Sequence, residues 1–212
     1  MPYVPIYHHC VAYLKIVTNS NNPEVESFTR IQILMVMGVT AIVLLLVSKV
    51  WQHFGSISLL PIKFTVNDTC FGIGIAIAIS AVSSLVYHLW PEYRRSADYY
   101  LELVIKPLLW PDLIWLGLLP GLSEELLFRG VMLTALGMNL VAVVVSSILF
   151  GVLHLSGEQQ WPYVVWATVV GGVLGYATLI TGNLLVPIVA HILTNLMSSC
   201  LWKFQHPVSV TD

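Results

Sequence analysis

Charge is the scarcest property of this chain: Asp, Glu, Lys and Arg make up 9% of its 212 residues. A soluble domain carries about 25% charged residues. Hydrophobic residues account for 57% of the chain, and the mean hydropathy is +0.83. The composition therefore predicts an integral membrane protein. A net charge of −2, with no basic stripe, argues against a nucleic-acid partner.

Cysteine is also scarce, and Cys10, Cys70 and Cys200 form no CxxC pair. This argues against a disulfide scaffold and a thiolate metal site. The sequence has no HExxH zinc helix, no GxSxG nucleophile elbow and no phosphate-binding P-loop. The short apolar stretch 11–17 is interrupted by Lys15 and is too weak for a secretory leader. We therefore expect the first membrane span to act as an uncleaved anchor.

Long apolar runs are abundant by contrast. A helix needs about 20 apolar residues to cross a bilayer. Segments of suitable composition are residues 31–51, 69–90, 112–137, 139–155, 162–181 and 184–202. The predicted fold is all-α, a polytopic transmembrane helical bundle with about six spans. We expect a multi-pass protein of a prokaryotic plasma membrane.

These segments suggest how the chain is organised. The expected parts are an N-terminal tail (1–30), two spans with the charged loop 91–106 (31–106), a core that carries the polar motifs (107–204) and a C-terminal tail (205–212). The charged loop could contain a short amphipathic helix. No internal repeat is visible, which weighs against transporters built from two related halves.

Two features of the core bear on how its helices pack. Pro120-Gly121 interrupts the span 112–137. Because proline removes a helical hydrogen bond, we expect a kinked or broken helix whose polar residues face a cavity. Gly171, Gly172 and Gly175 predict a face where two membrane helices approach closely, and a substrate groove is the alternative.

Two adjacent carboxylates, Glu124 and Glu125, lie within the apolar span 112–137. A charged residue at a helix centre costs about 2.5–3.5 kcal/mol on insertion scales, so such residues usually serve a function. Glu125 and Arg129 are four residues apart with the acid first, the favourable order for an ion pair. Glu124 has no partner in its own helix, which suits a general base. The alternative is that both carboxylates are solvated at the membrane interface.

Two further pairs of candidate site residues follow on the next apolar segments. Phe150 and His154 are four residues apart, on one face of a helix. His191 and Asn195 have the same spacing, and both can donate hydrogen bonds toward one point, as an oxyanion requires. Structural roles are the alternatives: a histidine satisfied at the interface or in the core, and a His/Asn clasp between two membrane helices.

Three motifs thus occur in order on successive helices: EExxxR (Glu124, Glu125, Arg129), FxxxH (Phe150, His154) and HxxxN (His191, Asn195). With them, residues 110–202 resemble the CAAX-protease and bacteriocin-processing (CPBP, or Abi) family, which includes the type II CAAX prenyl endopeptidases. The resemblance implies an all-helical intramembrane protease core with its site in a cavity. The first 100 residues resemble nothing beyond membrane spans.

The resemblance also implies a role for each motif residue. Glu124, together with His154, would activate a water molecule. His191 and Asn195 would stabilise the oxyanion. The residues that would support the site are Glu125, Arg129 and Phe150.

A metal is not required by this assignment. Glu124, His154 and His191 could in principle bind zinc. We favour a site without metal, because a His/Asn pair can bind the oxyanion with the same residues.

The expected function is therefore an intramembrane endopeptidase, which hydrolyses a peptide bond of a membrane-associated, prenylated CAAX-type or other polypeptide. Its expected partners are that substrate and the lipid bilayer. One alternative is a non-proteolytic scaffold or bacteriocin-immunity factor that uses the same cavity. Another is a proton-coupled transporter with a Glu/His relay, which the missing repeat disfavours.

Overall fold

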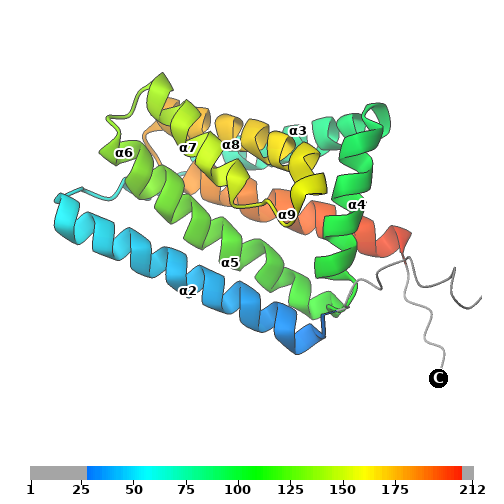
Figure 1. Cartoon of the computed structure of the whole chain (residues 1–212). Helices are drawn as coiled ribbons and strands as arrows, with labels where there is room; N and C mark the ends of the chain where they lie inside the picture. Colours follow the sequence, from blue (N-terminus) through cyan, green and yellow to red (C-terminus); the bar gives the residue numbers. More distant parts are fainter. Residues whose placement is uncertain (1–27, 207–212) are drawn as a thin grey trace, which may run out of the picture.

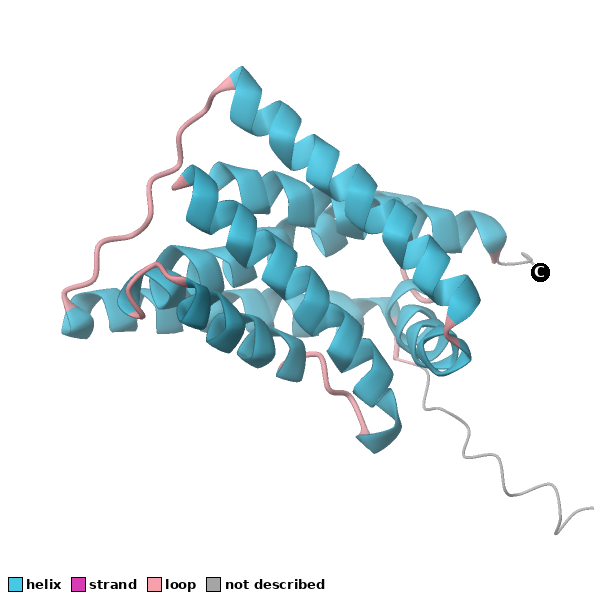
Figure 2. Cartoon of the chain, turned by 90° about the horizontal axis from the view of Figure 1, so that it is seen from above, coloured by secondary structure: helices cyan, strands magenta, loops and turns pink. Residues whose placement is uncertain are grey.

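The computed structural model describes residues 28–206, and this part of the chain folds into helices with no strand (Figures 1 and 2). The predicted all-α class is confirmed. The α-helices are α2 (Arg30–Gly55), α3 (Val66–Leu89), α4 (Pro91–Ile105), α5 (Leu113–Glu125), α6 (Leu133–Ala135), α7 (Leu140–Val152), α8 (Trp161–Thr181) and α9 (Leu185–Gln205). The 3-10 helices are η1 (Trp110–Asp112) and η3 (Glu158–Gln160), and η2 (Leu126–Met132) is a π-helix. The expected tails lie almost wholly outside the described residues.

The apolar segments of the sequence are all helical, which supports a multi-pass membrane protein. Four helical stretches are long and apolar enough to cross a bilayer: Arg30–Gly55, Val66–Leu89, Glu158–Thr181 and Leu185–Gln205. A fifth span results if α4 and the stretch Trp110–Ala135, which meet at a bend of 108°, are taken together. Helix α7 is apolar but shorter. The expectation of about six spans is thus roughly met.

Local sequence signals fix several helix ends. The side chain of Thr29 accepts a hydrogen bond from the Gln32 backbone and closes a capping box at the start of α2. Asn139 caps α7 in the same way through the backbone N–H of Ala142. Helix α8 ends at Thr181 and is capped by Gly182, whose φ of 58° is the left-handed conformation that glycine adopts without strain.

Helix α9 lies at the centre of the bundle and packs against α3 on one side and α5 on the other, while α7 packs against α8 (Figure 1). Small residues allow these close approaches. A Cβ atom added to Gly121 would lie 2.4 Å from Cγ1 of Ile192 on α9. One added to Gly151 on α7 would lie 2.8 Å from the carbonyl oxygen of Val164 on α8. Close packing of small residues is typical of membrane helices.

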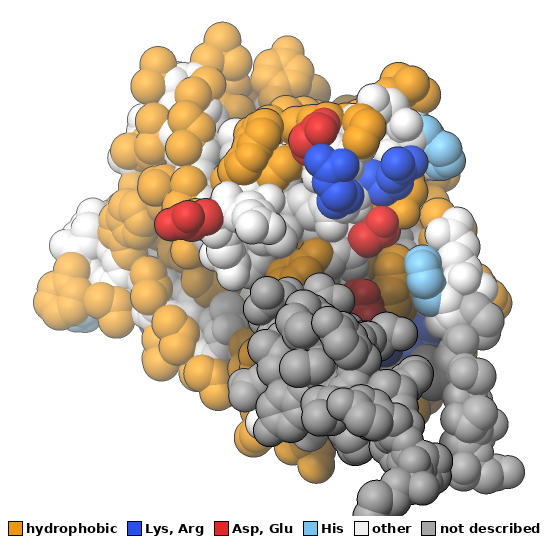
Figure 3. Space-filling view, turned by 45° about the vertical axis from the view of Figure 1, so that its right-hand side comes forward, with side chains coloured by type: hydrophobic (Ala, Val, Ile, Leu, Met, Phe, Trp, Pro, Cys, Tyr) orange, Lys and Arg blue, Asp and Glu red, His pale blue; other side chains and the backbone are white. Residues whose placement is uncertain are grey.

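The surface of the bundle is largely apolar. Helix α2, for example, exposes large hydrophobic residues along its whole length, among them Ile31, Val39, Leu46 and Phe54. Figure 3 shows orange hydrophobic side chains over much of the visible face, with Lys, Arg, Asp and Glu gathered in the region of α4. Apolar patches of this extent are covered by lipid in a membrane protein.

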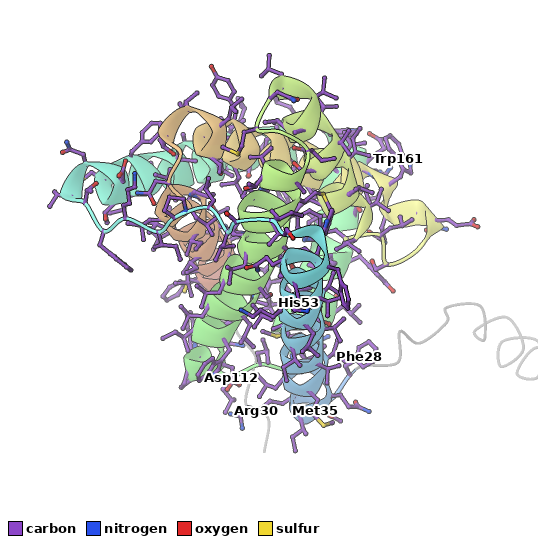
Figure 4. The ribbon with its side chains drawn as sticks, turned by 90° about the vertical axis from the view of Figure 1, so that its left-hand side faces the viewer. Phe28, Arg30, Met35, His53, Asp112 and Trp161 are labelled. Atoms are coloured by element: carbon purple, nitrogen blue, oxygen red, sulfur yellow. The ribbon has the colours of Figure 1, made fainter. Side chains whose placement is uncertain are left out.

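Charged residues tie the helix ends together at one end of the bundle. Arg30 donates to Asp112 through two nitrogens, at 2.7 and 2.8 Å, and so joins the start of α2 to the start of α5 (Figure 4). Asp112 also accepts a hydrogen bond from the backbone N–H of Leu109. The ammonium group of Lys203 on α9 donates to the carbonyl of Leu108, after the end of α4. Bidentate Arg–carboxylate pairs add geometric specificity as well as energy.

The span that contains Pro120 is helical at the proline, so the expectation of a broken helix is wrong, while the alternative of a kink stays a prediction. Pro120 lies within α5, and the departure from α geometry is the π-helix that begins at Leu126. The carbonyl of Gly130 within this π-helix accepts hydrogen bonds from the backbone of Leu60 at 3.2 Å and the hydroxyl of Thr134 at 3.0 Å. The loop between α2 and α3, which contains Leu60, is therefore hydrogen-bonded to the π-helix.

Candidate active site

The two glutamates of the EExxxR motif end α5, immediately before the π-helix. π-Helical turns occur frequently at functional sites. The side chain of Glu125 is fully buried, and so is that of Arg129. Arg129 donates from Nη1 to Oε1 of Glu125 at 2.6 Å. The ion pair expected from the four-residue spacing is therefore present.

Arg129 also connects this helix to α7 and α8. Its Nη2 atom donates to the carbonyl of Gly171 at 2.8 Å. Its Cζ atom lies 4.5 Å from the ring centroid of Phe150, within the range of a cation–π contact. A Cβ atom added to Gly171 would lie 3.1 Å from the Phe150 ring and 3.2 Å from Nη2, so the absence of a side chain makes room for both. This agrees with the packing interpretation of the glycines on α8.

His191 joins the same buried pair, which the sequence did not predict. Its Nδ1 atom lies 2.7 Å from Oε1 of Glu125, the oxygen that also accepts from Arg129. A carboxylate can only accept, so Nδ1 of His191 carries the hydrogen. The two residues are 66 positions apart. No local spacing could have indicated the contact, although a buried histidine in an apolar helix does call for a polar partner.

Glu124 and His154 face each other across a gap. Oε2 of Glu124 lies 4.0 Å from Nε2 of His154, and both side chains are mostly buried. Nδ1 of His154 lies 2.9 Å from the carbonyl oxygen of Phe150, so Nδ1 is the donor and Nε2 of the neutral ring is an acceptor. A carboxylate oxygen and a bare ring nitrogen are both acceptors. A water molecule could donate one hydrogen to each at ordinary distances of about 2.8 Å.

One cavity with a volume of about 170 Å³ brings the predicted catalytic residues together. It is lined by Glu124 from α5, His154 from the turn after α7, and His191 and Asn195 from α9. The ring of Phe150 also lines it and contacts the rings of both histidines, with centroids 4.9 and 5.7 Å apart. Residues far apart in the sequence thus line a single cavity.

The expected convergence of His191 and Asn195 on one point is present only in part. Both residues line the cavity. However, His191 uses Nδ1 for Glu125, and Nδ2 of Asn195 makes a long contact of 3.4 Å with the carbonyl of Leu116. Nε2 of His191 and the second amide hydrogen of Asn195 are the groups left for a ligand.

Sequence reasoning missed the aromatic residues of the cavity. Tyr93 and Tyr100 on α4 line it, as do Tyr163 and Trp166 on α8. Residues 91–106 were expected to be a solvated or interfacial loop with at most a short amphipathic helix. The segment does form a helix, α4, as that expectation allowed. Tyr93 and Tyr100 are seven residues apart, which places both on one face of this helix.

The described residues contain no preformed zinc site. A catalytic zinc takes three protein ligands at about 2.0–2.2 Å. Within residues 28–206, no three His, Cys, Asp or Glu side chains are grouped so that they could hold a metal ion. Nδ1 of His191 is engaged by Glu125.

Comparison with known proteins points to the same part of the chain. A helical membrane bundle with a buried Glu/His/Asn cavity is the architecture implied by the CPBP resemblance. Residues 106–197 match the family model described as type II CAAX prenyl endopeptidase Rce1-like, a protease family. This region contains every residue of the three motifs, and the resemblance to the CPBP family is confirmed.

A curated relative supports the same relationship. The uncharacterized protein YpbD of Bacillus subtilis (strain 168) is 28% identical over 136 residues, which cover 64% of this chain and 69% of the relative. No solved structure matches the chain significantly.

Proposed function

We propose that this protein is an intramembrane endopeptidase in which Glu124 and His154 activate a water molecule. The observation that carries the proposal is the 4.0 Å separation of Oε2 of Glu124 and Nε2 of His154 in the wall of the cavity. Two acceptors at this distance can hold one water by both of its hydrogens. That leaves an oxygen lone pair free to attack a carbonyl carbon.

In the proposed reaction, Glu124 takes a proton from this water as the oxygen attacks the carbonyl carbon of the peptide bond. A tetrahedral intermediate forms, and its negative charge lies on the former carbonyl oxygen. Protonated Glu124 then returns the proton to the leaving nitrogen, and the C–N bond breaks. His154 keeps the water aligned by accepting its second hydrogen bond. The products are a carboxylic acid and an amine, and no metal takes part.

The negative oxygen of the intermediate requires donors. Asn195 supplies a neutral donor from its amide. Because Nδ1 of His191 already carries a hydrogen toward Glu125, Nε2 can donate only when the ring is an imidazolium. In that form His191 offers a charge-assisted hydrogen bond, the stronger kind. Glu125 and Arg129 then serve to position His191 rather than to contact the substrate.

The proposal is tested by Glu124→Gln, which keeps the size of the side chain but cannot accept the proton. Membranes of cells with the wild-type protein, the variant or a deletion are compared by mass spectrometry of new C-terminal peptides. We expect a set of fragments that only wild-type membranes contain. Chelation of divalent metals should leave their formation unchanged. Glu102→Gln is the matched control, because Glu102 is an exposed carboxylate on α4.

Fragments produced equally by wild type and Glu124→Gln would overturn the proposal. So would a Glu124→Gln variant that rescues every phenotype of the deletion, because a scaffold or immunity factor needs the cavity but not the base. The thermal unfolding midpoint of each purified variant in detergent verifies that the fold is intact.

A further inference from the structure

Helix α4 supplies one wall of the cavity, although it precedes the region that matches the family model. Its residues in the wall are Tyr93, Ala97, Tyr100, Leu101, Val104 and Ile105. Their spacing follows one face of a helix. The opposite face carries ion pairs between exposed side chains, Arg95 with Glu92 at 3.2 Å and Lys106 with Glu102 at 2.7 Å.

The wall is aromatic where it approaches the proposed catalytic pair. The rings of Tyr100 and Tyr163 are stacked with centroids 4.6 Å apart and planes 23° apart. Tyr163 also stacks on Tyr93 at 6.3 Å, and its centroid lies 6.1 Å from that of His154. Stacked rings of this kind hold one another in place. Tyr100 is therefore held against Tyr163, the ring that lies next to His154 in the cavity.

The size of the cavity limits what can enter it. An engineered protein cavity of about 150 Å³ binds one benzene molecule. The cavity of about 170 Å³ has room for a group of this size. A prenyl chain has more than twice the carbon atoms of benzene, so the cavity cannot enclose the whole of it.

The chemistry of the wall limits the occupant further. Apart from Glu124 and the two histidines, the described residues that line the cavity carry no ionisable group other than tyrosine phenols. A carboxylate on the substrate would meet the negative charge of Glu124. An apolar group would displace weakly held water from aromatic and aliphatic side chains, which is favourable.

We propose that Tyr100 is a specificity-determining residue that selects one unlipidated apolar side chain next to the cleaved bond. The inference rests on the proposed protease function and adds the substrate class. A lipid attached to the substrate would then remain in the bilayer outside the cavity. The proposal rests on the stack of Tyr100 and Tyr163 next to His154, in a cavity with room for a group about as large as benzene.

The test uses the full chain in lipid nanodiscs and a peptide library prepared from a digested proteome. Cleavage sites are read by mass spectrometry. For wild type we expect Leu, Ile, Met or Phe to be enriched at one position beside the cleaved bond. Tyr100→Ala enlarges the cavity and should raise the relative rate for Trp over Ala at this position at least about tenfold, the scale of a changed hydrophobic pocket. Tyr100→Phe should keep the wild-type preference.

Tyr99→Ala is the matched control, because Tyr99 is the neighbouring residue on α4 and is 38% exposed. It should leave the cleavage profile unchanged. A profile unaltered by Tyr100→Ala, or a wild-type preference for charged residues, would overturn the inference while the protease proposal stands. Faster cleavage of farnesylated peptides than of matched unmodified ones, abolished by Tyr100→Ala, would also overturn it. Absence of any cleavage that depends on Glu124 would instead refute the proposed function itself.

Discussion

His191 on α9 and Glu125 on α5 are joined by a contact of 2.7 Å between Nδ1 and Oε1. Because a carboxylate accepts, this contact places a hydrogen on Nδ1 and leaves Nε2 for the proposed role of oxyanion donor. It also places the proposed donor on the same carboxylate that neutralises Arg129. Oε1 of Glu125 thus contacts both the proposed oxyanion donor and the buried arginine.

His191→Ala should lower kcat about 10²–10³-fold, the usual loss when one oxyanion donor is removed. KM should change little, because the donor acts on the charge that develops in the transition state. Steady-state kinetics on a peptide found in the proteomic comparison provide the measurement. His53→Ala, an exposed histidine on α2, is the control. A variant that raises KM and keeps kcat would assign His191 to ground-state binding instead.

Arg129→Met should destabilise the protein by about 3–5 kcal/mol, because it leaves the fully buried Glu125 with an uncompensated charge. The double variant Glu125→Leu with Arg129→Met removes both charges. It should be less destabilised than Arg129→Met alone. Thermal or denaturant unfolding in detergent gives the comparison, and Arg95→Met, at an exposed site on α4, should match wild type. A double variant as unstable as the sum of the single variants would mean that the two charges are not coupled.

Gly171→Ala should destabilise the fold by about 1–3 kcal/mol, the usual cost of overpacking. The added methyl would lie 3.1–3.3 Å from the Phe150 ring, Nη2 of Arg129 and the backbone of Ser147. Gly172→Ala is a matched control on the same helix, since its methyl would meet only Oγ of Ser147 at 3.9 Å. It should be neutral or stabilising by up to about 1 kcal/mol, because alanine favours a helix over glycine. Equal effects of the two substitutions would show that Arg129 and Phe150 can shift without cost.

The sequence alone predicted those features of the site that depend on helical periodicity. The Glu125–Arg129 pair follows from a four-residue spacing, and long apolar runs predict the helices. It also named the four residues that share the cavity, although their catalytic roles remain predictions. The motifs indicated them because polar residues are rare in apolar helices.

Features that depend on contacts between distant helices were not predictable in this way. The contact of His191 with Glu125 and the stack of Tyr100 on Tyr163 each join residues on different helices. The π-helix at Leu126 leaves no composition signal, because its residues would fit an α-helix equally well. Pro120 lies in the helix that leads into this π-helix, but a proline does not predict π geometry six residues later.

Asn183→Ala should loosen the loop between α2 and α3. The Asn183 side chain accepts from the backbone of Lys63 at 2.9 Å and of Leu185 at 3.0 Å, and it donates to the carbonyl of Lys63 and to Asp68, both at 2.8 Å. Asn183 is 1% exposed, so alanine leaves the buried backbone N–H of Leu185 unpaired, at about 1–3 kcal/mol, and also frees the partly buried N–H and carbonyl of Lys63.

The same loop donates from Leu60 to the carbonyl of Gly130 in the π-helix. Hydrogen–deuterium exchange should therefore become faster in residues 57–65 and also in the π-helix Leu126–Met132 of the variant. Asn67→Ala, an exposed asparagine at the start of α3, is the control and should leave both segments protected. Faster exchange confined to the loop would mean that the π-helix keeps its geometry without the Leu60 contact. Faster exchange in both would make this loop part of what holds Glu124 and Glu125 in position.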